Sequence, residues 1–203
     1  MRLEKDGART TLVDRYEGKR LNSPNDLVFK SNGDLYFTDP PYGLPKAFED
    51  PGKELPVEGV YRLARDGKLM LLSVDLRGPN GIAFSPDESQ LYVSDAARTV
   101  WVVFDVLEDG TLGGSKLLFD GSDFAAGAPG SADGMKVDSR GNVFAAAPGG
   151  IFVIAPDGKL LGRFDLGVAT GNCAWGEDGR TLFITAGPAV YRVRLTTRGA
   201  HAR

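Results

Sequence analysis

The sequence of 203 residues contains one cysteine and one histidine. A single cysteine excludes an internal disulfide and any metal site built from several cysteines. Cys173 lies inside an apolar strand pattern, which is typical of a buried structural thiol. His201 lies in the C-terminal tail, where chain ends commonly fray, so a Ser-His-Asp triad is not expected.

Long apolar runs and blocks of one charge are absent as well. No apolar run approaches the length of about 18 residues that a membrane span needs, and the first residues lack the apolar centre of a signal peptide. Lys and Arg number 24 against 27 Asp and Glu, without the basic patch expected of a nucleic-acid-binding protein. We therefore expect a cytoplasmic protein whose partner is a small molecule, with no nucleic acid and no membrane.

The chain is rich in turn-forming residues. It has 27 Gly and 12 Pro, while 42% of its residues are hydrophobic. This combination indicates a folded protein with many short strands rather than a disordered one.

Four segments of the sequence resemble one another. Each starts with Asn or Asp, continues through alternating apolar positions, turns at a polar or Gly-containing stretch, and returns through a second apolar run. The segments are NDLVFKSNGDLYFTD from Asn25, NGIAFSPDESQLYVSD from Asn80, DGMKVDSRGNVFAAA from Asp133 and NCAWGEDGRTLFITA from Asn172. Each segment predicts one hairpin, and a second strand pair follows it, with Asp-Gly at the first three of these turns.

Two hairpins per repeat, at a spacing of roughly 40 to 55 residues, favour an all-β fold, a β-propeller. Residues 1–20 read as a further hairpin without a preceding partner, so we expect about four and a half blades in a single, partial propeller domain over residues 1–203. A sandwich or an eight-stranded barrel is the alternative. Neither explains one polar residue that recurs in register at every repeat.

In a propeller the first strand of each blade lines the central channel, so the four recurring Asn and Asp residues should surround one mouth of that channel. Oxygen donors without His or Cys are the ligands of a hard cation, Ca²⁺ before Mg²⁺ or Mn²⁺, and such a site can also accept Zn²⁺. The alternative is that these residues only cap the turn before each strand. Their recurrence in register favours a common site.

The segment TDPPYGL contains two prolines that stiffen a loop and should present Tyr42 near the same mouth. Tyr42 would then contact a sugar-like ring, or else pack on its neighbour. Asp26 either orients a neighbouring asparagine or caps its own turn. Nine aromatic residues at strand-internal positions are expected to pack between blades: Phe29, Phe37, Phe84, Tyr92, Trp101, Phe144, Phe152, Trp175 and Phe183.

The motifs YEGKRLNSPNDLVFKSNGDLYFTDPPYGL, GPNGIAFSPDESQLYVSD and SADGMKVDSRGNVFAA resemble the gluconolactonase and regucalcin (senescence marker protein) family of six-bladed propellers. The resemblance runs from about residue 1 to residue 197. It implies one divalent metal at the channel mouth, commonly Ca²⁺ or Zn²⁺, and hydrolysis of sugar lactones. It also implies that Asn80 and Asp133 are metal ligands, that Asn25 contacts the substrate or metal-bound water, and that Asp133 is the general base.

Two features depart from this family. A glutamate ligand near the start of its members has no counterpart here, because the first blade and the inner half of the second are missing by comparison. Regucalcin also has an arginine where this chain has Ser23, which agrees better with the bacterial and fungal lactonases.

We therefore expect a metal-dependent hydrolase that opens sugar lactones. Asp133 is the expected catalytic residue, Asn25 and Tyr42 the expected substrate contacts, and Asn80, Asp133 and Asn25 the expected metal ligands, with Ca²⁺ ahead of Zn²⁺, Mn²⁺ or Mg²⁺. The alternatives are a related esterase or phosphotriesterase, or an inactive, truncated binding propeller.

Overall fold

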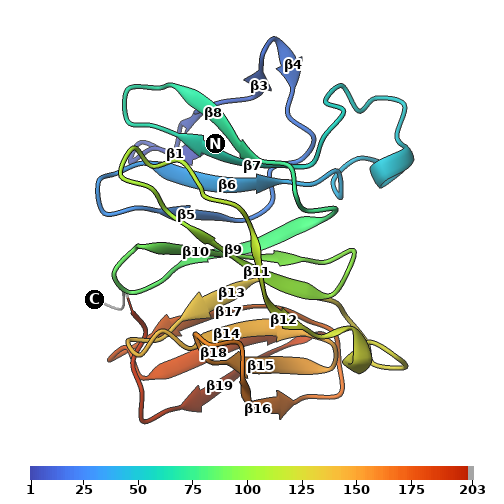
Figure 1. The fold of residues 1–203 in the computed structure, drawn as a ribbon, viewed down its shortest axis with the longest axis vertical. Coiled ribbons are helices and arrows are strands. Elements are labelled where there is room, and N and C mark those ends of the chain that lie inside the picture. The colour runs from blue at the N-terminus through green and yellow to red at the C-terminus, as the bar shows by residue number, and fades with distance from the viewer. Residues whose placement is uncertain (201–203) are drawn as a thin grey trace.

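The computed structural model describes residues 1–200, so His201 lies outside the described residues. Within this range the chain is almost entirely β-structure, and the only helical elements are two short 3₁₀ turns, η1 (Ala47–Glu49) and η2 (Ser122–Phe124) (Figure 1). No helix in the described range is long and apolar enough to cross a membrane. The expected all-β class is confirmed.

The four sequence repeats form four antiparallel sheets, each built from strands that follow one another in the chain. The first sheet contains β5 (Leu27–Phe29), β6 (Leu35–Asp39), β7 (Gly59–Leu63) and β8 (Leu69–Ser73), and the second β9 (Pro79–Phe84), β10 (Gln90–Asp95), β11 (Val100–Asp105) and β12 (Lys116–Asp120). The third contains β13 (Met135–Val137), β14 (Val143–Ala147), β15 (Gly150–Ile154) and β16 (Leu160–Asp165), and the fourth β17 (Thr170–Gly176), β18 (Thr181–Ala186) and β19 (Ala189–Arg194). This is the blade order of a β-propeller.

The turns inside the sheets follow the sequence signals. At the Asp-Gly turns between β7 and β8 and between β15 and β16, Gly67 and Gly158 have φ values of 88° and 85°. A residue with a Cβ adopts this left-handed conformation only at a steric cost, which is why glycine is found there.

The hydrophobic core lies between neighbouring sheets rather than inside one of them. Tyr36 and Phe84 pack between the first and second sheets, and Trp101 and Phe152 between the second and third. The third and fourth sheets bury a further cluster that includes Cys173. Aromatic packing between blades is thus confirmed for most of the expected residues.

Three of the nine are exceptions. Phe183 belongs to none of the clusters between sheets in residues 1–200, Phe37 packs in a cluster with Leu21 and Leu55, and 61% of the surface of Phe29 is exposed. Phe29 lies on β5, on the side of the first sheet that faces away from the other three. The prediction that Phe29 packs between blades was wrong, because among the described residues only the short N-terminal hairpins lie on that side and they leave it exposed.

The described arc of blades is open. The N-terminal hairpins, β1 (Arg2–Leu3) with β2 (Arg9–Thr10) and β3 (Arg15–Tyr16) with β4 (Lys19–Arg20), lie beside the first sheet, at the opposite end of the molecule from β19 (Figure 1). In residues 1–200, β1 pairs only with β2, and β19 pairs only with β18.

Candidate functional site

The inner strands of the four sheets, β5, β9, β13 and β17, lie side by side, with β9 against β5 and β13, and β13 against β17. The four recurring polar residues lie at the start of these strands. Three of them, one from each of the first three sheets, line one cleft with a volume of about 420 Å³. The cleft is lined by Asn25, Tyr42, Phe48, Asn80, Ala96, Ala97, Ser131 and Asp133.

A second hollow of about 380 Å³ adjoins this cleft on the other side of Asp133, over the third and fourth sheets. It is lined by Gly130, Ser131, Asp133, Ala169, Thr170, Gly171, Thr185 and Gly187. Asp133 and Ser131 line both spaces, so the Asp133 carboxylate can be reached from either side.

Asn80 is nearly buried, with 6% of its surface exposed. Its Oδ1 atom has no hydrogen-bond partner in the described structure. A buried amide oxygen without a partner costs free energy, about 1–3 kcal/mol, so it is expected to accept a bond from a ligand or water. Asn80 thus lines the cleft with an amide whose buried oxygen has no partner among the described residues.

Burial raises the pKa of the Asp133 carboxyl above its ordinary value of 3.8. The negative charge of Asp26 raises it further, while the backbone N–H of Gly134 and the side chain of Asn80 act in the opposite direction. A carboxylate that is desolvated beside another negative charge is stabilised by a nearby cation. The electrostatics of the cleft thus favour a positive ligand next to Asp133.

Tyr42 lies in the cleft wall and also packs on a neighbour, so both of its predicted roles fit the geometry. Its ring meets Phe48 edge to face, with ring centroids 5.7 Å apart, and its hydroxyl donates to the backbone carbonyl oxygen of Gly78 at 3.4 Å. Burial raises the pKa of the Tyr42 hydroxyl to about 12. At neutral pH it is therefore a hydrogen-bond donor.

Asn172 and Asp26 are placed differently from the three residues of the cleft. The Oδ1 atom of Asn172 accepts from the N–H of Cys173 at 2.8 Å, and its amide group lies against Gly134 in the third sheet. Asn172 lines neither hollow, so the expected ring has three of its four members. The Asp26 carboxylate accepts from the N–H groups of Leu27 and of Ile82, at 2.8 and 3.4 Å, and thereby links the first two sheets.

The donors of the cleft fit a hard cation. The residues that line the cleft carry one carboxylate, on Asp133, and two amide groups, on Asn25 and Asn80, and oxygen ligands of this kind suit Ca²⁺ rather than a soft metal. Among residues 1–200 no group of three or more His, Cys, Asp or Glu side chains could hold a metal ion by itself. The fit therefore depends on the amides, above all on the unpartnered Asn80 Oδ1.

Two buried carboxylates hold the loops that carry the cleft residues. Asp39, at the end of β6, accepts from the N–H groups of Asn22 and Ser23, each at 2.8 Å, just before Asn25. Asp95, at the end of β10, accepts from those of Arg77 and Gly78, at 2.8 and 3.1 Å. Sequence reasoning missed both. The signal was a hydroxyl residue followed by Asp at the end of the first two hairpins.

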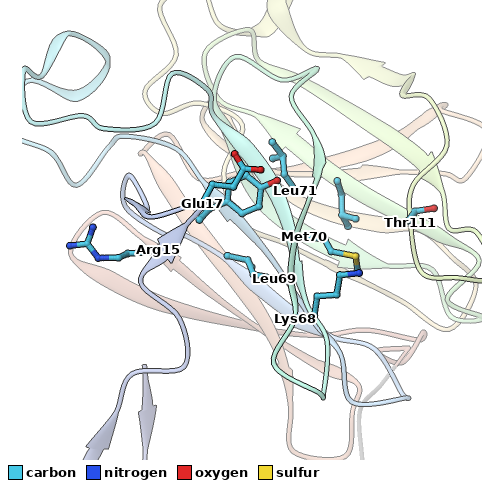
Figure 2. A pocket seen from close by; sticks show the side chains of 9 residues that line it. Arg15, Glu17, Lys68, Leu69, Met70, Leu71 and Thr111 are labelled. Carbon is cyan, nitrogen blue, oxygen red and sulfur yellow. The ribbon is translucent and has the colours of Figure 1, made fainter.

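The cavity at the outer strand of the first sheet is slightly larger, about 450 Å³, but has a different character (Figure 2). Figure 2 shows Leu69 between its strand and the hairpin that carries Arg15 and Glu17, and Lys68 and Met70 on the other side of that strand, toward Thr111. None of the recurring polar residues lines this cavity. The site that the repeats predict is therefore the cleft over the inner strands.

Comparison with known proteins agrees with this fold. Residues 1–187 match the family model described as SMP-30/Gluconolactonase/LRE-like region. A gluconolactonase of Zymomonas mobilis is 48% identical over 199 residues, which are 94% of this chain and 55% of that protein. The solved structure of a gluconolactonase from Xanthomonas campestris superimposes with a TM-score of 0.81 and 36% identity, over 97% of this chain and 63% of that one.

A calcium-binding regucalcin from Agrobacterium tumefaciens shares the fold, with a TM-score of 0.69 at 20% identity, over 87% of this chain and 62% of that one. The chain spans about half the length of the curated relatives that it matches. With its blades and the match over residues 1–187, the chain belongs to the SMP-30/gluconolactonase/LRE-like family.

Proposed function

We propose that this chain contributes the site of a lactone hydrolase that opens sugar lactones with the help of a divalent cation. The observation that carries the proposal is the cleft that gathers Asn25, Asn80 and Asp133, with a buried Asn80 oxygen that no described residue partners. The gluconolactonases of Zymomonas mobilis and Xanthomonas campestris, at 48% and 36% identity, support sugar lactones as the substrate class.

Lactone opening adds water across the ester bond of the ring. The oxygen of the water forms a bond to the carbonyl carbon, the bond from that carbon to the ring oxygen breaks, and the ring oxygen ends as a hydroxyl. Asp133, whose carboxylate lines the cleft, takes the proton of the attacking water. The same carboxyl then returns a proton to the leaving ring oxygen, so the product is a hydroxy acid and Asp133 is regenerated.

Two further residues bind the substrate in this proposal. The Asn25 amide and the Tyr42 hydroxyl both face the cleft. The Asn25 amide donates to a hydroxyl group of a sugar ring, the Tyr42 oxygen accepts from one because its own proton is donated to Gly78, and the ring of Tyr42 offers the sugar an apolar surface. They orient the lactone carbonyl toward Asp133.

Asn80 Oδ1, the Asp133 carboxylate and Asn25 Oδ1 would hold the cation. A divalent cation, Ca²⁺ first by the donor set, supplies positive charge that polarises a carbonyl and eases deprotonation of water. Calcium binding by the regucalcin of Agrobacterium tumefaciens agrees with this choice, although that protein shares only the fold. Asn80 Oδ1 has no partner among the described residues, so a bound cation would supply one.

The test is hydrolysis of gluconolactone by the 203-residue chain, with and without a chelator, followed by addition of Ca²⁺, Mn²⁺ or Zn²⁺. We expect chelator-sensitive activity, and in Asp133→Ala a loss of about 100-fold or more, as for other general bases. Asp138→Asn is the control, because Asp138 is also a buried, hydrogen-bonded carboxylate but lies at the far end of β13. Full activity of Asp133→Ala would exclude the proposed base.

A further inference from the structure

Thr38, in β6 of the first sheet, has a fully buried hydroxyl that joins two of the cleft residues. Its Oγ1 accepts from the N–H of Asp26, the neighbour of Asn25, at 3.2 Å. It donates to the backbone carbonyl oxygen of Asn80, in the second sheet, at 2.7 Å. One hydroxyl thus fixes the start of β5 against the start of β9.

Ser94 occupies the matching place in β10 of the second sheet and makes the matching bonds. Its buried Oγ accepts from the N–H of Gly81, the neighbour of Asn80, at 2.8 Å. It donates to the backbone carbonyl oxygen of Asp133, in the third sheet, at 3.0 Å. The two hydroxyls, which we call the hydroxyl relay, connect Asn25, Asn80 and Asp133 in series through their backbones.

The sheets meet closely where the relay crosses. A Cβ on Gly81 would lie 2.3 Å from the carbonyl oxygen of Asp133 and 2.8 Å from the Cα of Gly134. Removal of the Ser94 hydroxyl would leave the Gly81 N–H without its acceptor and the Asp133 carbonyl oxygen without this donor, between closely packed backbones. Loss of the hydroxyl therefore shifts Asn80 relative to Asp133.

The hydroxyl relay does not continue beyond the third sheet, which carries Asp133, the last of the three cleft residues. The matching residue of the third sheet is Ala146, which has no hydroxyl. In the fourth sheet the Thr185 hydroxyl bonds only to the backbone of Asn172 in its own sheet, at 3.1 and 3.2 Å. Hydroxyl bridges between sheets thus occur between the first and second sheets and between the second and third, which carry the three proposed ligands.

We propose that Thr38 and Ser94 are positioning residues, which set the spacing of Asn25, Asn80 and Asp133 and so the affinity of the cleft for a divalent cation. The inference rests on the proposed function. It goes beyond that function because neither hydroxyl lines the cleft. Both act through the backbone of the residues that do.

The test compares Thr38→Val, which keeps the shape of the side chain and removes only the hydroxyl, with Ser94→Ala. Ca²⁺ binding to the 203-residue chain is measured by calorimetry, and kcat and KM are measured with gluconolactone. We expect the Kd for Ca²⁺ to rise about 10- to 100-fold in each variant, as for other residues that orient metal ligands. We expect kcat to fall with it, and KM to change less.

A readout without metal or substrate accompanies these measurements. Amide hydrogen exchange should become faster at Asp26 in Thr38→Val and at Gly81 in Ser94→Ala, because these N–H groups lose their acceptor. Ser94→Thr keeps a hydroxyl, as the first sheet does at Thr38, and should retain Ca²⁺ affinity. If Ser94→Ala does not fold, the same measurements on Thr38→Val test the proposal.

Thr181→Val is the matched control. Thr181 is a buried threonine of β18 whose hydroxyl donates to Glu177 at 2.7 Å, away from the cleft. It should lose thermal stability as Thr38→Val does and keep its Ca²⁺ affinity. An equal loss of affinity in both variants would overturn the proposal, and so would wild-type affinity and exchange in Thr38→Val.

Failure of the proposed function has a different signature. In that case the wild-type chain neither binds Ca²⁺ nor hydrolyses gluconolactone, whatever stands at positions 38 and 94. Amide hydrogen exchange at Asp26 and Gly81 is then the only test of the hydroxyl relay. Unchanged exchange rates in both variants would overturn it.

Discussion

At the residue scale, burial changes the pKa of a single carboxylate, Asp39. It is fully buried at the end of β6 and accepts two backbone N–H bonds. Burial nevertheless raises its pKa from 3.8 to about 6. Two backbone N–H groups do not fully offset the loss of water around the charge.

This shift predicts how stability depends on pH. Between pH 3.8 and about 6 the folded chain holds a proton on Asp39 that the unfolded chain has released. The free energy of unfolding contributed by Asp39 is therefore full below pH 3.8, falls as the pH rises to about 6, and is constant above that. The total is on the order of 3 kcal/mol for a shift of about two pKa units.

Urea denaturation between pH 4 and pH 8 measures this effect. The wild-type chain should lose stability over the lower part of the range more steeply than Asp39→Asn, which cannot titrate. Asp39→Asn should also be less stable at every pH, since an amide cannot accept both backbone bonds. Equal pH slopes in the two proteins would show that Asp39 does not titrate in this range.

The sequence predicted some residues of the site and not others for a physical reason. Asn25, Asn80 and Asp133 recur at one position of a repeat, and a propeller brings such positions together. Asp39 and Asp95 also recur, but their burial depends on loops whose path the repeat does not determine. Asn172 recurs too, yet its Oδ1 accepts from the N–H of Cys173 in its own strand and its amide packs against Gly134, so it does not line the cleft.

At the scale of elements, the loop between β8 and β9 connects Asp95, the cleft wall at Tyr42, and Asn80. Within this loop, Gly78 donates to Asp95 at 3.1 Å and accepts from the Tyr42 hydroxyl at 3.4 Å. A Cβ on Gly78 would lie 2.2 Å from the Tyr42 oxygen and 3.0 Å from the Cβ of Ala97. The loop can hold this path only with glycine at position 78.

Gly78→Ala should therefore displace Tyr42 and raise KM for gluconolactone about fivefold, corresponding to a lost hydrogen bond of about 1 kcal/mol. Gly162→Ala, on the outer strand β16, is the control, because a Cβ there meets no atom within 4 Å. Steady-state kinetics of both variants and of Tyr42→Phe measure the effect. A KM in Gly78→Ala equal to that of Gly162→Ala would contradict the role of this loop.

The blades themselves were predictable because each repeat carries a complete set of strand and turn signals. The Asp-Gly turns and the alternating apolar runs are local, and the structure follows them strand for strand. Which side of the first sheet is covered is not local. It depends on whether another sheet packs there, and for this reason the prediction for Phe29 failed.

At the scale of the whole molecule, the described arc ends in two uncovered apolar surfaces. On one side Phe29 and Leu27 are exposed beside a hollow of about 270 Å³ under the N-terminal hairpin. On the other side Val190, with 69% of its surface exposed, and Tyr191 lie on β19, whose outer edge has no paired strand in residues 1–200. Apolar surfaces and free strand edges of this kind promote association between molecules.

The 203-residue chain should therefore self-associate as its concentration rises, and Phe29→Ser combined with Val190→Lys should reduce this association. Because both side chains are exposed, each change should alter the free energy of unfolding by no more than about 0.5 kcal/mol. Sedimentation velocity over a range of concentrations measures the association, and urea denaturation measures stability. Phe84→Ser, in the buried core between the first two sheets, should instead unfold the chain. A wild-type chain that stays monomeric at high concentration would show that these surfaces are too small to associate.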